Sequence, residues 1–197
     1  MIRFVRTALV LLAVAVPAPA LIVACRDQPA TWSEADRVFV SRMIPHHHLG
    51  MVLTDLAAQR AADVRLRRLV FEMSGYHQSE LGLLDGWARG RGISESKDFP
   101  GDLADAEIDA LAGTAGEVFD RFWLELMIRH HEGALQIAAE QIDSGTVAEA
   151  RDLARSVARV QSGEIAEMER LLGELCGAAG VTPPAAHCDV VATPGQP

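Results

Sequence analysis

The chain has 197 residues, of which 27 are Asp or Glu and 18 are Lys or Arg, and its formal net charge is −9. This acidic balance excludes the basic footprint of a nucleic-acid-binding protein, so we expect no nucleic-acid partner. The length fits one domain, or two small repeats that share one core.

The amino-terminal segment has the pattern of a bacterial lipoprotein signal. Two arginines precede an uncharged run over residues 8–24, which contains two prolines and resembles a secretory signal rather than a stable membrane span. A lipobox-like sequence ends at Cys25. We expect residues 1–24 to be removed, Cys25 to be lipidated and residues 25–30 to form a linker. The protein would then be exported and anchored by lipid at the outer face of the cell membrane, or in the periplasm or outer membrane. The alternative is a plain secretion signal with an incidental cysteine.

The segment 31–176 is rich in alanine, leucine, glutamate and arginine, and none of its runs alternates as a half-buried strand does. The pattern predicts four long helices and a short one, at about 31–60, 63–89, 103–112, 115–144 and 146–176.

Short motifs mark the ends of these predicted helices. Capping boxes that begin at Thr31, Thr114 and Thr146, together with a cap at Asp63, predict helix starts. Gly145 is placed where a left-handed residue would end a helix.

An internal repeat relates the two halves of the chain. The segment that runs from Asp36 to His47 returns, 84 residues later, as Asp120 to His131, and the apolar positions that follow stay in phase. Each half therefore predicts a helical hairpin, with repeat 1 at about 31–92 and repeat 2 at about 115–176. Two hairpins can bury their apolar stripes only against each other, which predicts an all-α, antiparallel four-helix bundle. Residues 177–197 read as a Gly/Ala/Pro-rich tail.

The repeat carries two Met/His-His clusters, which are candidate metal ligands because imidazole is the commonest side-chain ligand and thioether sulfur is a soft one. Helix geometry places Met43 and His47 on the same face as Asp36, with His46 nearer its edge, so the second histidine of each pair is the better ligand. The candidate set is Met43, His46, His47, Met127, His130, His131, Met73, His77, Asp36 and Asp120.

A purely structural interpretation stays open. Methionine is a common core residue, and buried histidines are often hydrogen-bonded core groups with an aspartate as acceptor. The chain would then be a helical interaction module whose acidic exterior meets a protein partner or a second copy. Glu80 and Glu164 occupy matching positions and could support the metal ligands, but we expect them to be solvated or paired with arginines, as carboxylates on helices usually are. Cys176 and Cys188 could form a disulfide in an oxidising compartment, or remain free thiols.

The tandem motifs resemble the domain of unknown function 305 (DUF 305) family. The two Met-Ile-x-His-His cores, the upstream aspartate and aromatic residue, and the Gln-x-x-Glu-Ile-x-x-Met sequence that begins at Gln161 carry this resemblance over roughly residues 33–175. It implies an exported or lipid-anchored bacterial helical bundle of ferritin-like shape, and some members are linked with copper handling. The first half departs from the second at His77, which matches Gln161, and at His48, which matches Glu132.

The ligand types in the candidate set favour some metal ions over others. Thioether and imidazole ligands favour Cu(I) and Ag(I), with Cu(II) accessible through imidazole, whereas zinc prefers more thiolate or carboxylate. A di-iron bundle needs Glu-x-x-His pairs, and the chain contains none. We therefore expect a cell-envelope lipoprotein that sequesters or buffers copper rather than an enzyme. The alternatives are the interaction module and a copper-dependent oxidoreductase, which would need a substrate pocket.

Overall fold

The structure is a computed structural model that describes residues 31–178. The predicted signal peptide, the lipidation site at Cys25 and the linker lie outside the described residues, as do Cys188 and the rest of the tail. Within the described part, the chain forms five helices and no strand: α1 (Glu34–Arg60), α2 (Val64–Arg91), α3 (Asp105–Ala112), α4 (Gly116–Ser144) and α5 (Ala148–Ala178). None of these helices is long and apolar enough to cross a membrane.

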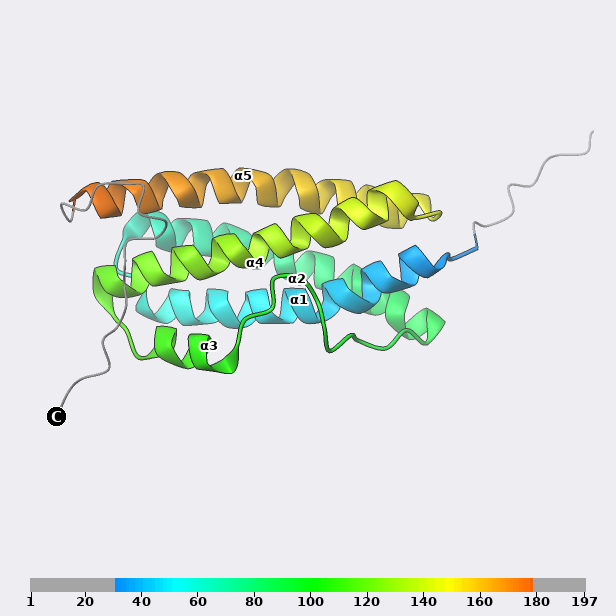
Figure 1. Ribbon diagram of the computed structural model, residues 1–197, viewed down its shortest axis with the longest axis horizontal. Helices are drawn as coiled ribbons and strands as arrows, with labels where there is room; N and C mark the ends of the chain where they lie inside the picture. Colours follow the sequence, from blue (N-terminus) through cyan, green and yellow to red (C-terminus); the bar gives the residue numbers. More distant parts are fainter. Residues whose placement is uncertain (1–30, 179–197) are drawn as a thin grey trace, which may run out of the picture.

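The four long helices form an antiparallel bundle (Figure 1). α1 and α2 make one hairpin, α4 and α5 make the other, and α1 packs along α4 to join them. α2 and α5 complete the ring of four but touch much less than the other neighbouring pairs. The predicted all-α bundle of two repeated hairpins is therefore confirmed, with helix bounds close to those expected from the periodicity.

The helix ends follow partly different rules from the predicted ones. α1 begins after Ser33, not Thr31: the Ser33 hydroxyl accepts a hydrogen bond from the Asp36 amide at 3.2 Å, and the Asp36 carboxylate accepts one from the Ser33 amide at 2.8 Å. Asp63 caps α2 as predicted. Thr114 does not cap α4, because its hydroxyl donates to the Leu111 carbonyl at the end of α3.

Of two glycines that follow long helices, only one is left-handed. Gly145 has φ −70°, so α4 does not end in a left-handed residue. α2 does end in a left-handed residue, Gly92, with φ 61°.

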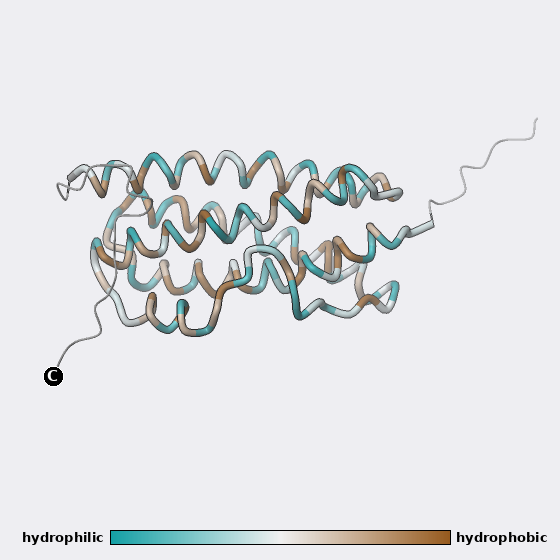
Figure 2. Tube along the Cα trace, viewed as in Figure 1, coloured by the Kyte–Doolittle hydropathy of each residue, from teal (hydrophilic) through white to brown (hydrophobic). Residues whose placement is uncertain are grey.

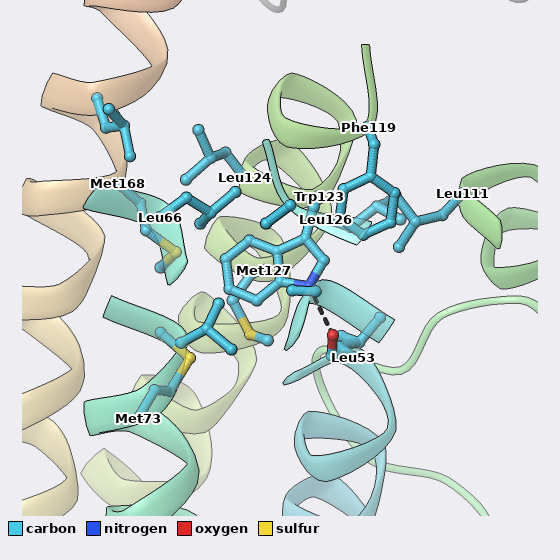
Figure 3. Packing of buried hydrophobic residues seen from close by; sticks show 14 of the residues in the cluster. Leu53, Leu66, Met73, Leu111, Phe119, Trp123, Leu124, Leu126, Met127 and Met168 are labelled. Atoms are coloured by element: carbon cyan, nitrogen blue, oxygen red, sulfur yellow. Dashed lines mark hydrogen bonds between the residues drawn. The ribbon is translucent and has the colours of Figure 1, made fainter. Parts of the chain in front are cut away.

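Hydrophobic and hydrophilic residues alternate along every helix, as amphipathic packing requires (Figure 2). The apolar side chains gather in two clusters. One lies toward the α1–α2 turn and centres on Trp123, whose indole nitrogen donates to the Leu53 carbonyl at 2.8 Å (Figure 3). The other lies toward the α4–α5 turn and includes Phe39, Leu84 and Ile137. Between them, each long helix contributes polar residues from its middle.

A crossover segment, residues 92–104, joins the two hairpins. α2 and α4 run in the same direction, so the chain must return along the outside of the bundle before α4 begins, and Figure 1 shows it doing so together with α3. The segment is fastened to α1, where the Ser96 amide donates to the Ser41 carbonyl at 2.8 Å. That carbonyl is available because Pro45, four residues further on, has no amide hydrogen.

The carboxyl end of α5 holds the one described cysteine. Cys176 is buried and disulfide-bonded. Its predicted partner, Cys188, lies outside the described residues, so this pairing stays a prediction.

Candidate metal centre

Five histidines form a buried layer across the middle of the bundle. His46 and His47 come from α1, His77 from α2, and His130 and His131 from α4, and each is at most 1% exposed. The rings of His46 and His130 stack with centroids 3.7 Å apart, and the His77 ring lies 5.0 Å from that of His47 and 5.8 Å from that of His131. Both members of each pair are buried because α1 and α4 pack against each other as well as against their hairpin partners. His46, expected near the edge of the face, thus faces the neighbouring helix α4.

Two of these histidines form matching hydrogen bonds with carboxylates. Nε2 of His47 lies 2.9 Å from Oε2 of Glu80, and Nε2 of His131 lies 2.9 Å from Oε2 of Glu164. The expectation that both glutamates are solvated or paired with arginines is wrong, because each reaches inward to a ring. A carboxylate acceptor keeps the proton on Nε2 and leaves Nδ1 as the free lone pair, which is the usual outer support of a metal-binding histidine.

The other pair is held by backbone carbonyls. Nε2 of His46 donates to the His130 carbonyl at 2.9 Å, and Nδ1 of His130 donates to the Gly101 carbonyl at 2.8 Å. Gly101 reaches this position because it faces Gly133, where an added Cβ would lie 2.3 Å from the Gly101 nitrogen. Phe99 adds an edge contact to the His46 ring, with centroids 5.9 Å apart. The crossover segment therefore completes the layer on the α1–α4 side.

Six ring nitrogens of the layer have no hydrogen-bond partner, although all are buried. Burial lowers the pKa of His46, His77 and His131 well below the ordinary value, and neighbouring histidines lower it further. The pKa of His130 is lowered to about 4, chiefly by burial. These four rings are therefore neutral near pH 7, which is the form that binds metals. The unpaired atoms are Nδ1 of His46, His47 and His131, Nε2 of His130, and both nitrogens of His77.

Two of these free nitrogens lie close to Gly50 on α1. A Cβ placed there would lie 3.0 Å from Cε1 of His77, and 3.3 Å from both Nδ1 of His77 and Nε2 of His130. The absence of a side chain at Gly50 therefore lets the His77 and His130 rings approach α1 together.

The methionines flank the layer. Met43, Met73 and Met127 are fully buried, each one helical turn before a histidine of its own helix. Met73 and Met127 belong to the cluster around Trp123 (Figure 3), and Met43 belongs to the other cluster. Met168 on α5 shares the first cluster and was not among the sequence candidates, because its match in the first repeat is Leu84.

The structure places the two candidate aspartates at the ends of the bundle instead. The Asp36 carboxylate accepts hydrogen bonds from the Thr146 hydroxyl at 2.7 Å and the Val147 amide at 3.2 Å, in the α4–α5 turn. Asp120 accepts from the Ala62 and Asp63 amides, at 2.9 and 2.7 Å, in the α1–α2 turn. Each aspartate thus caps the turn of the opposite hairpin, and neither is hydrogen-bonded to a histidine.

The layer fits a metal through its donor chemistry rather than through a preformed cage. Among residues 31–178, no three His, Cys, Asp or Glu side chains are arranged to hold an ion. The neutral imidazoles with free nitrogens, together with thioethers one turn away, are nevertheless the ligands that soft metals prefer. These side chains would have to change rotamer before several of them could bind one ion.

Comparison with known proteins gives one family. The family described as "Domain of unknown function (DUF305)" matches residues 36–172. No curated protein matches the chain.

Solved structures of similar proteins share the fold. A DUF305 protein from Streptomyces coelicolor, described as secreted, is 26% identical; the match covers 75% of this chain and 95% of that one, with a TM-score of 0.66. A DUF305 fragment from Deinococcus radiodurans is 27% identical, with coverage of 75% and 99% and a TM-score of 0.66. CopM in its Cu(I)-bound form is 25% identical, with coverage of 71% and 96% and a TM-score of 0.63.

Proposed function

Because the chain belongs to the DUF305 family, we propose that it is an exported protein that binds a soft metal ion, copper above all, in the histidine layer of its bundle. The observation that carries this proposal is the set of six buried ring nitrogens without partners. A buried polar atom that makes no hydrogen bond costs stability, so a core with this many calls for a ligand that satisfies them.

The nitrogen donors we propose are His47 and His131 through Nδ1, His130 through Nε2, and His77, whose two nitrogens are both free. Glu80 and Glu164 hold two of these rings in place and increase their basicity. A bound metal ion would act as a Lewis acid and accept the lone pairs of these ring nitrogens.

The methionines indicate which metal ions the layer would prefer. Met43, Met73 and Met127 place thioether sulfur beside the layer, which favours Cu(I) and Ag(I) over harder ions. The similarity to CopM, solved in Cu(I)-bound and Ag-bound forms, supports the same choice. We leave Asp36 and Asp120 out of the ligand set because backbone amides occupy their carboxylates.

Sequestration fits this site better than catalysis. Every ring of the layer is buried, so an ion bound there would be enclosed by the bundle. Export is supported by the Streptomyces coelicolor relative described as secreted. Attachment to a membrane through a lipidated Cys25 is a proposal from the sequence alone.

A structural polar core is the competing explanation. The His–Glu and His–carbonyl hydrogen bonds would suit it, because such bonds fix a unique core. It gives no reason for His77, which makes no hydrogen bond through either nitrogen. Gln161, the match of His77 in the second repeat, is likewise buried with an unpaired amide.

Anaerobic titration of residues 26–197 with Cu(I) against a competing chelator tests the proposal. We expect tight, stoichiometric binding that raises the melting temperature, because the ion binds only the folded state. His77→Gln, which installs the residue of the second repeat, should weaken binding by roughly 10-fold or more. His48→Gln is the matched control, since His48 is exposed. Wild-type affinity no greater than that of a His47→Ala, His131→Ala double variant would refute the proposal.

A further inference from the structure

The histidine layer has no exposed ring, so an ion must pass between two helices to reach it. The bundle offers four seams. Those within the two hairpins, α1–α2 and α4–α5, are closely packed, as is the seam between α1 and α4. The α2–α5 seam has much less contact.

The α1–α4 seam is covered from outside as well. The crossover segment is fixed to α1 by two hydrogen bonds, from the Ser96 amide to the Ser41 carbonyl at 2.8 Å and from the Ser41 hydroxyl to the Ser94 carbonyl at 2.7 Å. Phe99 then lies against His46, and the Gly101 carbonyl accepts from His130. An ion that entered on this side would have to displace the segment.

Carboxylates occupy the α2–α5 seam. The side chains of Glu80 and Glu164 are 10% and 11% exposed, whereas the side chains of their histidine partners are 0% exposed. Among the side chains of the hydrogen-bonded layer, only these two therefore reach solvent. Burial, with a contribution from the charges of Glu80 and Glu72, raises the pKa of Glu164 to about 7, so three carboxyl groups lie near one another at this seam.

The seam is also hollowed at the surface. A depression of about 250 Å³ lies between α2 and α5, with Glu72 and Glu167 in its wall. Arg65 and Arg68 line it too, but both are ion-paired, Arg68 with Glu72 at 3.0 Å and Arg65 with Glu174.

We propose that metal cations enter and leave the histidine layer between α2 and α5, past Glu80 and Glu164, with Glu72 at the outer rim. This inference rests on the proposed metal binding. The carboxylates attract cations and repel anionic complexes, and the free nitrogens behind them take up the ion. Carboxylates that line a low-dielectric opening raise the local concentration of cations and the association rate, by about 10-fold or more at low salt. Salt screens this attraction.

The test is stopped-flow uptake of Ag⁺, which avoids redox changes, followed by tryptophan fluorescence. Glu72→Gln is the cleanest variant, because its described partner is Arg68 and not a histidine. We expect it to slow association several-fold at low salt, with stoichiometry and dissociation rate unchanged. The double variant Glu80→Gln, Glu164→Gln should slow association by about 10-fold or more. Glu132→Gln, the same charge change at an exposed position of α4, is the control and should have no effect.

The outcomes separate the two proposals. A wild-type protein that takes up no Ag⁺ refutes metal binding and the entry route with it. Uptake at the same rate in the wild type and in the Glu72 and Glu80/Glu164 variants refutes the route alone. Phe99→Ala checks the covered side: a large acceleration in this variant, without an effect of the glutamates, would place the entrance under the crossover segment.

Discussion

Replacing Asp36 by alanine removes the acceptor at which three parts of the bundle meet. Its Oδ1 accepts from the Gln141 amide at 2.7 Å and from the Val147 backbone at 3.2 Å, and its Oδ2 accepts from the Ser33 and Thr146 hydroxyls, both at 2.7 Å. The carboxylate is fully buried. Each buried donor left without a partner costs about 1–3 kcal/mol, so we expect Asp36→Ala to destabilise the fold by about 3–5 kcal/mol.

The dependence of stability on pH identifies the carboxylate as the cause. Burial alone would raise the pKa of Asp36, but the hydrogen bonds from Gln141, Ser33 and Thr146 outweigh it and hold the pKa well below the ordinary value. A folded pKa below the unfolded value of about 3.9 means that this stabilisation is complete above the unfolded pKa and is lost as the pH falls toward the folded one. Wild-type stability should therefore drop below about pH 4 more steeply than that of Asp36→Asn, which has no proton to bind there.

Urea unfolding followed by circular dichroism, from neutral to acidic pH, measures both effects. Asp55→Ala is the matched control, because Asp55 is exposed on the same helix. A loss of less than about 1 kcal/mol in Asp36→Ala would refute the reasoning, since that is the range of an ordinary exposed substitution. Unchanged stability in Asp36→Asn together with lost metal binding would instead return Asp36 to the ligand set.

Two further predictions concern the crossover segment. Gly133→Ala should destabilise the fold by about 1–3 kcal/mol, because the new Cβ would meet the Gly101 backbone at 2.3–2.4 Å. Urea unfolding measures this loss, and unchanged stability would contradict the close packing. Pro45→Ala restores an amide that competes with the Ser96 amide for the Ser41 carbonyl, so hydrogen exchange at the Ser96 amide should become faster. Unchanged exchange would show that Pro45 does not help to hold the crossover segment against α1.

The long helices and their pairing were predictable because the repeat and the apolar periodicity both act over many residues. The caps were less so, because a four-residue pattern contains no information about acceptors on other helices. Thr146 illustrates this: its hydroxyl donates to Asp36, which lies 110 residues away in the chain, instead of capping α5 as a box with Glu149 would require. Ser33 is a different case: its capping box with Asp36 is local, but the repeat made Asp36 a metal candidate instead of a cap partner.

The histidines were predictable as a group, but their support was not. Glu80 and Glu164 each follow their histidine partner by 33 residues, so the repeat did contain a signal that could have paired them with His47 and His131. The contribution of Gly101 had no such signal, because the crossover segment occurs once and has no counterpart with which to compare it.

The departures from symmetry have a common origin in that single connection. Pro45 matches Arg129 in the other repeat, and Gly133 matches Leu49. Pro45 leaves the Ser41 carbonyl free to accept from the crossover segment, and Gly133 leaves space for the backbone of that segment. A duplicated hairpin needs only one such connection, and it can cover only one of the two seams between hairpins. The opposite seam, between α2 and α5, is therefore left to side chains, and there the repeat places Glu80 and Glu164 together. The topology that closes the histidine layer on one side thus explains why ion access should be sought on the other.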